Sequence, residues 1–160
     1  MNDAARDRPL LLLDIDGVLQ PAGNAVPPGY ERLEFADSVV VLNRAHGDWL
    51  RDLAERFEIV WASTWGGSAN ELIGSRLGLP AFAHVELGTM GSVGTRKLRA
   101  IQTFVADRSF AWIDDELFED AYEWAASCTA PTLLIRTQAY VGMTADHVDT
   151  LKTFAAEPLR

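Results

Sequence analysis

The chain has 160 residues, which is the size of one ordinary domain and enough to bury a core without disulfides or structural metals. With 48% apolar and 23% charged residues, its composition is that of a globular protein and excludes a disordered or fibrous one. The net charge of −9 argues against an extended nucleic-acid interface, although it allows a local basic groove. We therefore expect a single domain over residues 1–160, with residues 1–8 as a flexible tail.

The first half of the chain predicts two buried strands separated by a loop, a hairpin and a helix. Four consecutive leucines at residues 10–13 are too few for a helix and indicate a buried strand. Residues 20–29 hold three prolines and two glycines, as expected for an exposed loop. In chain order there follow a hairpin with its turn at Ala36-Asp37-Ser38, an amphipathic helix and a second buried strand, at residues 31–42, 44–57 and 58–62.

The second half of the chain continues this alternation of helices and strands. Ser68 and Glu71 form a capping-box pattern that opens a short helix, and Gly78 and Pro80 end it. After it we expect a strand at 82–87, a helix at 96–106 capped by Thr95, a strand at 110–113, a helix that starts at Asp114, a strand at 132–135 and a helix from Thr144 to about 157. The alternation predicts an α/β fold of three layers, Rossmann-like, in which about five mostly parallel strands carry helices on both faces.

Polar side chains and a glycine come directly after three of the predicted strands: Asp14, Asp16 and Gly17, then Ser63 and Thr64, then Asp114 and Asp115. The carboxyl ends of parallel strands share one edge of a sheet, where ligands bind, so we expect these residues to lie together. Each segment alone also has a simpler explanation. Asp-Gly is a common turn pair, and acids at a helix start interact favourably with the helix dipole.

Two features of this set point to bound ions. Carboxylates as close as those expected for Asp14 and Asp114 repel each other unless a cation neutralises them, and oxygen ligands suit Mg²⁺. Lys97 is one of only two lysines in the chain, and we expect it in the first turn of its helix. A cation is unfavourable there, which suggests an anionic partner, although a solvated surface lysine is the commoner alternative.

Taken in chain order, these segments resemble the motifs of the haloacid dehalogenase (HAD) superfamily of phosphohydrolases. The match runs from Leu10 to about Arg136 and consists of LLLLDIDG ending at Gly17, IVWAS ending at Ser63, Lys97 with Arg96 beside it, and FAWIDD ending at Asp115. Within that superfamily, DIDGVL, WASTW and WIDDE are similar to the pattern of a small branch linked to RNA-repair proteins.

The resemblance implies a Mg²⁺-dependent phosphatase. Asp14 would be the nucleophile that forms an aspartyl-phosphate, and Asp16 would be the general acid and then the general base. The phosphate would be held by Lys97, Gly17 and a hydroxyl, for which Ser63 fits the motif best because it directly ends the strand, with Thr64 one residue further as the alternative. The Mg²⁺ ligands would be Asp14, the backbone carbonyl of Asp16, Asp114, and Asp115 either directly or through water.

The spacing of the motifs leaves no room for a large cap domain, because 49 residues separate Asp14 from Ser63 and 34 separate Ser63 from Lys97. We expect an open site under a small flap around residues 20–41. Such a site suits a phosphorylated small molecule, a nucleotide or the end of a phosphorylated macromolecule. Trp65 either stacks on a base or sugar or packs against its own loop.

Two other functions compete with phosphatase activity. One is a non-catalytic module that binds phosphate or a nucleotide on the same scaffold, and the other is a nucleotide-sugar transferase that uses Asp-x-Asp for Mn²⁺. A chain of 160 residues leaves little room for the donor and acceptor sites of a transferase.

The remaining sequence features bear on location. The single cysteine, Cys128, forms no intrachain disulfide and is expected in the core, and the three histidines are expected to be structural or at the surface. The apolar run at residues 10–13 stops at Asp14, so we expect no secretory signal. No stretch approaches the roughly 20 apolar residues of a membrane span. We expect a cytoplasmic protein without membrane association.

Overall fold

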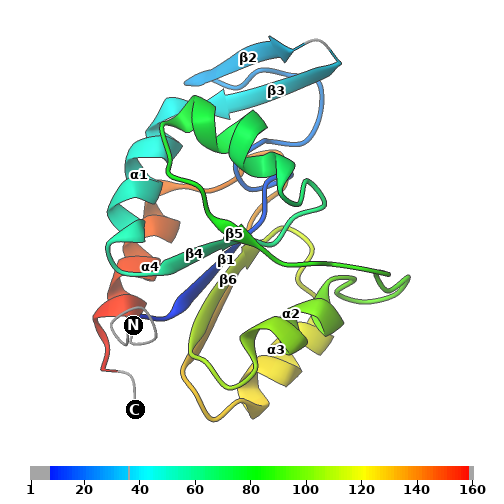
Figure 1. The fold of residues 1–160 in the computed structure, drawn as a ribbon, viewed down its shortest axis with the longest axis vertical. Coiled ribbons are helices and arrows are strands. Elements are labelled where there is room, and N and C mark those ends of the chain that lie inside the picture. The colour runs from blue at the N-terminus through cyan, green and yellow to red at the C-terminus, as the bar shows by residue number, and fades with distance from the viewer. Residues whose placement is uncertain (1–7, 36, 159–160) are drawn as a thin grey trace.

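A five-stranded parallel sheet lies at the centre of the computed structural model, which describes residues 8–35 and 37–158 (Figure 1). The strand order is β5-β4-β1-β6-β7. The strands are β5 (Ala83–His84), β4 (Glu58–Trp61), β1 (Leu10–Leu13), β6 (Phe110–Asp114) and β7 (Thr132–Arg136). The predicted α/β class, the parallel sheet and the number of strands are therefore confirmed.

The four leucines of β1 explain why this strand lies in the middle of the sheet. All four are fully buried, because helices cover both faces. Leu11 and Leu13 pack into one apolar cluster, and Leu10 and Leu12 point to the other face and pack into a second cluster. A strand that is buried on both faces needs apolar residues at every position, as this one has.

Two helices pack on each face of the sheet (Figure 1). They are α1 (Arg44–Ala54) and α4 (Ala145–Ala156) on one face, and α2 (Leu98–Val105) and α3 (Glu119–Ser127) on the other. Thr144 caps α4, as predicted, in a capping box whose second member is His147. Within the described chain, none of the helices has both the length and the apolar character needed to cross a membrane.

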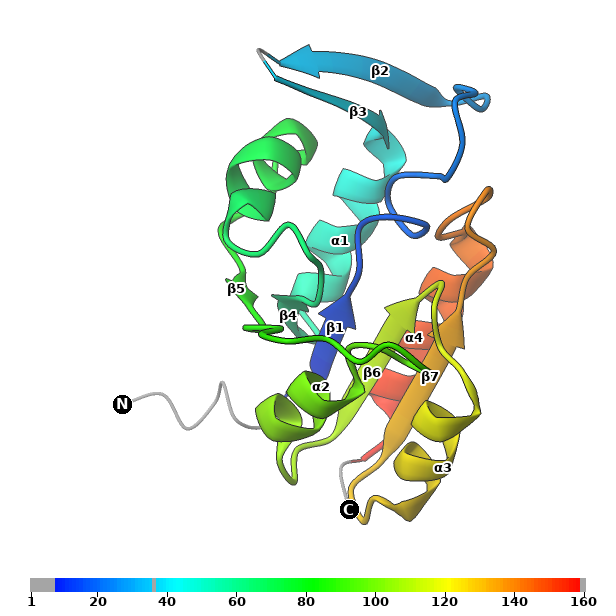
Figure 2. The ribbon, with the colours of Figure 1, turned by 90° about the vertical axis from the view of Figure 1, so that its right-hand side faces the viewer.

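The predicted hairpin is confirmed as the antiparallel pair β2 (Tyr30–Phe35) and β3 (Ser38–Asn43). Figure 2 shows it above the carboxyl ends of the sheet strands, where it serves as a small flap. The loop before it is exposed from residue 22 to 26. The predicted turn residue Ala36 and residues 1–7 of the predicted tail lie outside the described residues, and Arg8 docks by donating to the carbonyl of Ala54 at 2.8 Å.

Three predicted helix starts are wrong: one helix lacks its predicted cap, one has its capping residue engaged elsewhere, and one begins after residues that belong to a strand and a loop. The segment after β4 is a π-helical turn, Asn70–Gly74, followed by a 3₁₀ turn, Ser75–Leu77, and it has no side-chain cap where Ser68 was expected. Helix α2 starts at Leu98, not Arg96, because the Thr95 hydroxyl instead donates to Asp120 and accepts from the Phe118 N–H.

The third wrong start is that of α3, which begins at Glu119 and not at Asp114. Asp114 is the last residue of β6, so the helix dipole does not account for it. Two other elements are shorter than predicted. Strand β5 spans only Ala83–His84, and α1 ends at Ala54. The predicted stop at Gly78 is confirmed by its left-handed backbone, with φ of 66°.

Candidate active site

Three carboxylates meet at the carboxyl edge of the sheet. Asp14 directly follows β1 and Asp114 ends β6, and the pairing of Leu13 with Ile113 brings the two side by side. One oxygen each from Asp14, Asp114 and Asp115 lies within 4.8 Å of the other two. Asp14 is 4% exposed and Asp114 is 1% exposed, so this charge is largely withdrawn from water.

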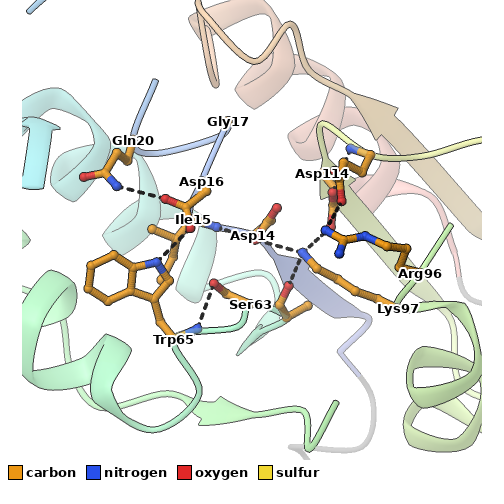
Figure 3. A network of polar contacts seen from close by, with 12 residues as sticks. Asp14, Ile15, Asp16, Gly17, Gln20, Ser63, Trp65, Arg96, Lys97 and Asp114 are labelled. Carbon is orange, nitrogen blue, oxygen red and sulfur yellow. Dashed lines mark hydrogen bonds and ion pairs between the residues drawn. The ribbon is translucent and has the colours of Figure 1, made fainter. Parts of the chain in front are cut away.

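Lys97 lies between two of these carboxylates (Figure 3). Its Nζ is 2.9 Å from Asp14 Oδ1 and 2.8 Å from Asp114 Oδ2, and it donates to the carbonyl of Ala62 at 2.9 Å. An ammonium has three protons, so each has an acceptor. Burial disfavours its charge, but the two aspartates outweigh burial and raise the pKa of Lys97, which is therefore a cation.

The carboxylate cluster carries more negative charge than Lys97 neutralises. Burial and the neighbouring Asp114 raise the pKa of Asp14 well above its ordinary value, and the same two causes raise the pKa of Asp115. Three carboxylates against one ammonium leave an excess of two negative charges when all are ionised. The side-chain ligand atoms are all oxygen, and this donor set and charge fit a divalent hard cation such as Mg²⁺.

Asp16 lies apart from this cluster, in the turn after β1. Its side chain is exposed, and each of its oxygens accepts one hydrogen bond: Oδ1 from Gln20 Nε2 at 2.8 Å and Oδ2 from Trp65 Nε1 at 2.9 Å. Gly17 follows with φ of 77°, and a Cβ built there would lie 2.4 Å from Asp115 Cγ. Only glycine fits this position, because the chain approaches Asp115 so closely.

The two candidate hydroxyls differ in what they face. Ser63 is 1% exposed, and its Oγ accepts a hydrogen bond from the Trp65 N–H at 3.3 Å. Thr64 is exposed and lines the cleft beside Asp14 and Lys97. Trp65 is partly buried and packs against the apolar cluster on the α1 side of the sheet, not only against its own loop.

A cleft of about 610 Å³ connects these residues to the hairpin. Six of the predicted site residues form its inner end: Asp14, Asp16, Gly17, Thr64, Lys97 and Asp115. Ser63 and Asp114 do not line it, and its outer wall is formed by residues 20–24, Arg32, Val39 and Val41. Arg96 also lines it, but its guanidinium pairs with Glu116 at 2.9 Å, whereas Lys97 binds the central aspartates. Gln20 and Arg32 were not predicted as site residues from the sequence, because no local pattern marks either residue.

The strand order, the Asp-x-Asp turn after the central strand and the lysine between two strand-end aspartates define a domain of the HAD superfamily, a phosphohydrolase-like scaffold. More narrowly, the chain belongs to the family described as "HAD domain in Swiss Army Knife RNA repair proteins", whose sequence model matches residues 10–148. A comparison with curated proteins gives no match. The predicted resemblance to the HAD superfamily and to its RNA-repair branch is therefore confirmed.

Proposed function

We propose that the protein is a Mg²⁺-dependent phosphatase that acts through an aspartyl-phosphate on Asp14. The observation that carries this proposal is the position of Asp14 at the inner end of the cleft, beside Lys97 and two further carboxylates. Asp14 Oδ1 accepts hydrogen bonds from Lys97 and from the Ile15 N–H at 2.8 Å, which leaves Oδ2 without a donor among the described residues. We assign Oδ2 as the attacking atom.

Asp14, Asp114 and Asp115 would hold the Mg²⁺, together with the backbone carbonyl of Asp16. When bound, the ion would supply the positive charge that lets a carboxylate approach a phosphate dianion. The uncompensated charge of the cluster supports this assignment.

The reaction has two displacements at phosphorus. In the first, a bond forms between Asp14 and phosphorus while the phosphorus–ester oxygen bond breaks, and Asp16 gives a proton to the leaving oxygen. In the second, Asp16 takes a proton from water as the water oxygen attacks phosphorus. The bond to Asp14 then breaks, and inorganic phosphate leaves with both side chains restored.

Lys97 and Thr64 would bind the phosphate oxygens, and Gly17, whose N–H donates to the carbonyl of Gln20, would leave room for them because it has no side chain. All three line the cleft, whereas Ser63 is buried beneath the turn and its hydroxyl accepts a hydrogen bond from the Trp65 N–H. We therefore favour Thr64 over Ser63 as the hydroxyl that contacts phosphate. These donors would offset the charge that develops on the transferring group.

The substrate we propose is the phosphorylated end of an RNA strand or a nucleotide. The cleft has the size of a ligand pocket and continues from Asp14 to Arg32 on the hairpin. The description of the family, which refers to RNA repair, supports the same substrate class. An excess of acidic residues elsewhere limits the contact to the end of the strand.

The test is release of phosphate from p-nitrophenyl phosphate and from 3′- or 5′-phosphorylated oligoribonucleotides, with Mg²⁺ and with a chelator. We expect Asp14→Asn to lower kcat by about a thousandfold or more, because the nucleophile is lost. The exposed Asp107→Asn serves as the matched control. Full activity of Asp14→Asn contradicts the mechanism, and phosphate binding by wild type without turnover identifies a non-catalytic module instead.

A further inference from the structure

Asp16 is the one proposed reacting group that is held by neutral donors alone. Asp14 and Asp114 are buried and paired with Lys97, but Asp16 is exposed at the cleft. An exposed carboxylate on a turn samples several rotamers unless its neighbours fix it. Here an amide and an indole each donate to a different oxygen, at 2.8 and 2.9 Å, and together fix the plane of the carboxylate (Figure 3).

The two donors reach Asp16 from different elements. Trp65 belongs to the turn after β4, where its indole N–H is donor only and competes for no proton. Gln20 closes the turn after β1, since its carbonyl accepts from the Gly17 N–H at 2.7 Å. Both residues therefore position the carboxylate without acting as an acid themselves.

Gln20 also connects Asp16 to the flap. Its side-chain oxygen accepts from the backbone N–H of Val41 at 3.0 Å, while its Nε2 donates to Asp16. Val41 lies on β3 and lines the same cleft as Arg32 and Val39 of the hairpin. A ligand that shifts β3 would therefore move the side-chain amide of Gln20, and with it the hydrogen bond that this amide donates to Asp16.

We propose that Gln20 and Trp65 are positioning residues that aim Asp16 at the leaving oxygen, and that Gln20 makes this aim depend on the position of β3. The inference rests on the proposed function, because it assigns Asp16 the proton transfer. A general acid must lie within hydrogen-bond distance of the oxygen that it protonates, so a carboxylate that turns away loses this contribution even when it is present.

The test uses the leaving group, because the need for a proton depends on it. Nitrophenolate leaves without protonation, whereas an alkoxide does not, so we compare kcat/KM for p-nitrophenyl phosphate with kcat/KM for an alkyl phosphate. We expect Gln20→Met and Trp65→Phe to lower the alkyl value by about tenfold or more and the nitrophenyl value by less than about threefold. Asp16→Asn should show the same selectivity with a larger loss.

Matched controls make the same substitutions away from Asp16. Gln102→Met on α2 and Trp49→Phe on α1 should leave both substrates unchanged. An equal loss on both substrates for Gln20→Met and Trp65→Phe overturns the positioning role and shows a general structural one. A wild-type protein that hydrolyses neither substrate overturns the proposed function itself, and this inference with it.

The dependence on β3 is tested by Val41→Pro, which removes the N–H that donates to Gln20. Proline is tolerated where the N–H of an edge strand points away from its partner, as that of Val41 does. We expect kcat/KM for the alkyl phosphate to fall selectively, as in Gln20→Met, but by a smaller factor. The melting temperature should not change. Equal loss on both substrates, or no loss on either, shows that the hairpin does not act on Asp16.

Discussion

Each proton of the Lys97 ammonium is engaged by the protein itself: two by Asp14 and Asp114 and one by the carbonyl of Ala62. No proton is left for a phosphate in this arrangement. To bind a phosphate, Lys97 has to release a carboxylate, and a Mg²⁺ ion on the same carboxylates would take over their neutralisation. Metal binding and phosphate binding are therefore expected to favour each other at this site.

The first prediction concerns the stability that Lys97 provides in the absence of metal. In Lys97→Met, Asp14 and Asp114 stay buried without their cation, so we expect the free energy of unfolding to fall by about 3 kcal/mol. Urea denaturation in the presence of a chelator measures this change. Lys152→Met is the control, because Lys152 is partly exposed and pairs with Asp52 at the surface, where little change is expected. Equal losses in the two variants would contradict a special role for the buried lysine.

At the scale of elements, the sequence predicts where the strands end better than where the helices begin. A run of apolar residues marks a buried strand without help from any partner, and parallel strands end at one edge, which is why Asp14 and Asp114 were expected to meet. A helix cap depends on competing partners. The Thr95 hydroxyl binds Asp120 and Phe118, more than 20 residues away in the chain, and nothing local to Thr95 predicts this.

Contacts between residues far apart in the chain also explain why some site residues could not be predicted from the sequence. Trp65 donates to Asp16 across 49 residues, and Gln20 accepts from Val41 across 21. The hairpin was predicted from its pattern of residues, and a flap over the site was expected at residues 20–41, but the side chains of the flap that line the cleft were not predicted, because they depend on how the loop before the hairpin packs. Arg32 is such a residue, since only the folded chain brings it to the outer wall of the cleft.

The hairpin gives the second prediction, which separates binding from chemistry. Arg32 lines the cleft, and its pair with Glu34 is exposed on both sides and hence weak, so the guanidinium is available to an anion. We expect Arg32→Ala to raise KM about tenfold for a phosphorylated oligoribonucleotide, which has a second phosphate, and to leave p-nitrophenyl phosphate nearly unchanged. Steady-state kinetics at low salt measures both.

Arg44→Ala is the matched control for this experiment. Arg44 starts α1, pairs with Glu31 of the same hairpin and is 83% exposed, but it does not line the cleft. Its substitution should leave both KM values unchanged. If Arg44→Ala and Arg32→Ala raise KM for the oligoribonucleotide equally, the effect is one of overall charge and not of a contact in the cleft.

At the scale of the whole molecule, His46 lies where the flap, the first helix and the last helix meet. It is fully buried on α1, one ring nitrogen is 3.2 Å from the carbonyl of Met143 before α4, and its ring packs edge-on against Tyr30 of β2. The other ring nitrogen has no hydrogen-bond partner among the described residues. Burial lowers the pKa of His46 to about 4, so the fold holds this histidine neutral.

The third prediction follows from this neutral state. Between the ordinary pKa of 6.5 and about 4, the unfolded chain binds a proton at His46 that the folded chain does not, so stability falls as the pH falls. From pH 7 to pH 4.5 the loss due to His46 is about 2 kcal/mol. The raised pKa values of Asp14 and Asp115 act in the opposite direction, since the folded state takes up those protons at higher pH.

Because these effects oppose each other, the measurement is the difference between wild type and His46→Gln. We expect the free energy of unfolding of the variant to fall less than that of wild type from pH 7 to pH 4.5, by about 2 kcal/mol, in urea titrations with a chelator. Gln102→Met on α2, which removes no titratable group, should follow wild type. A His46→Gln protein with the wild-type pH slope would contradict this role of His46 and place the acid sensitivity in another group.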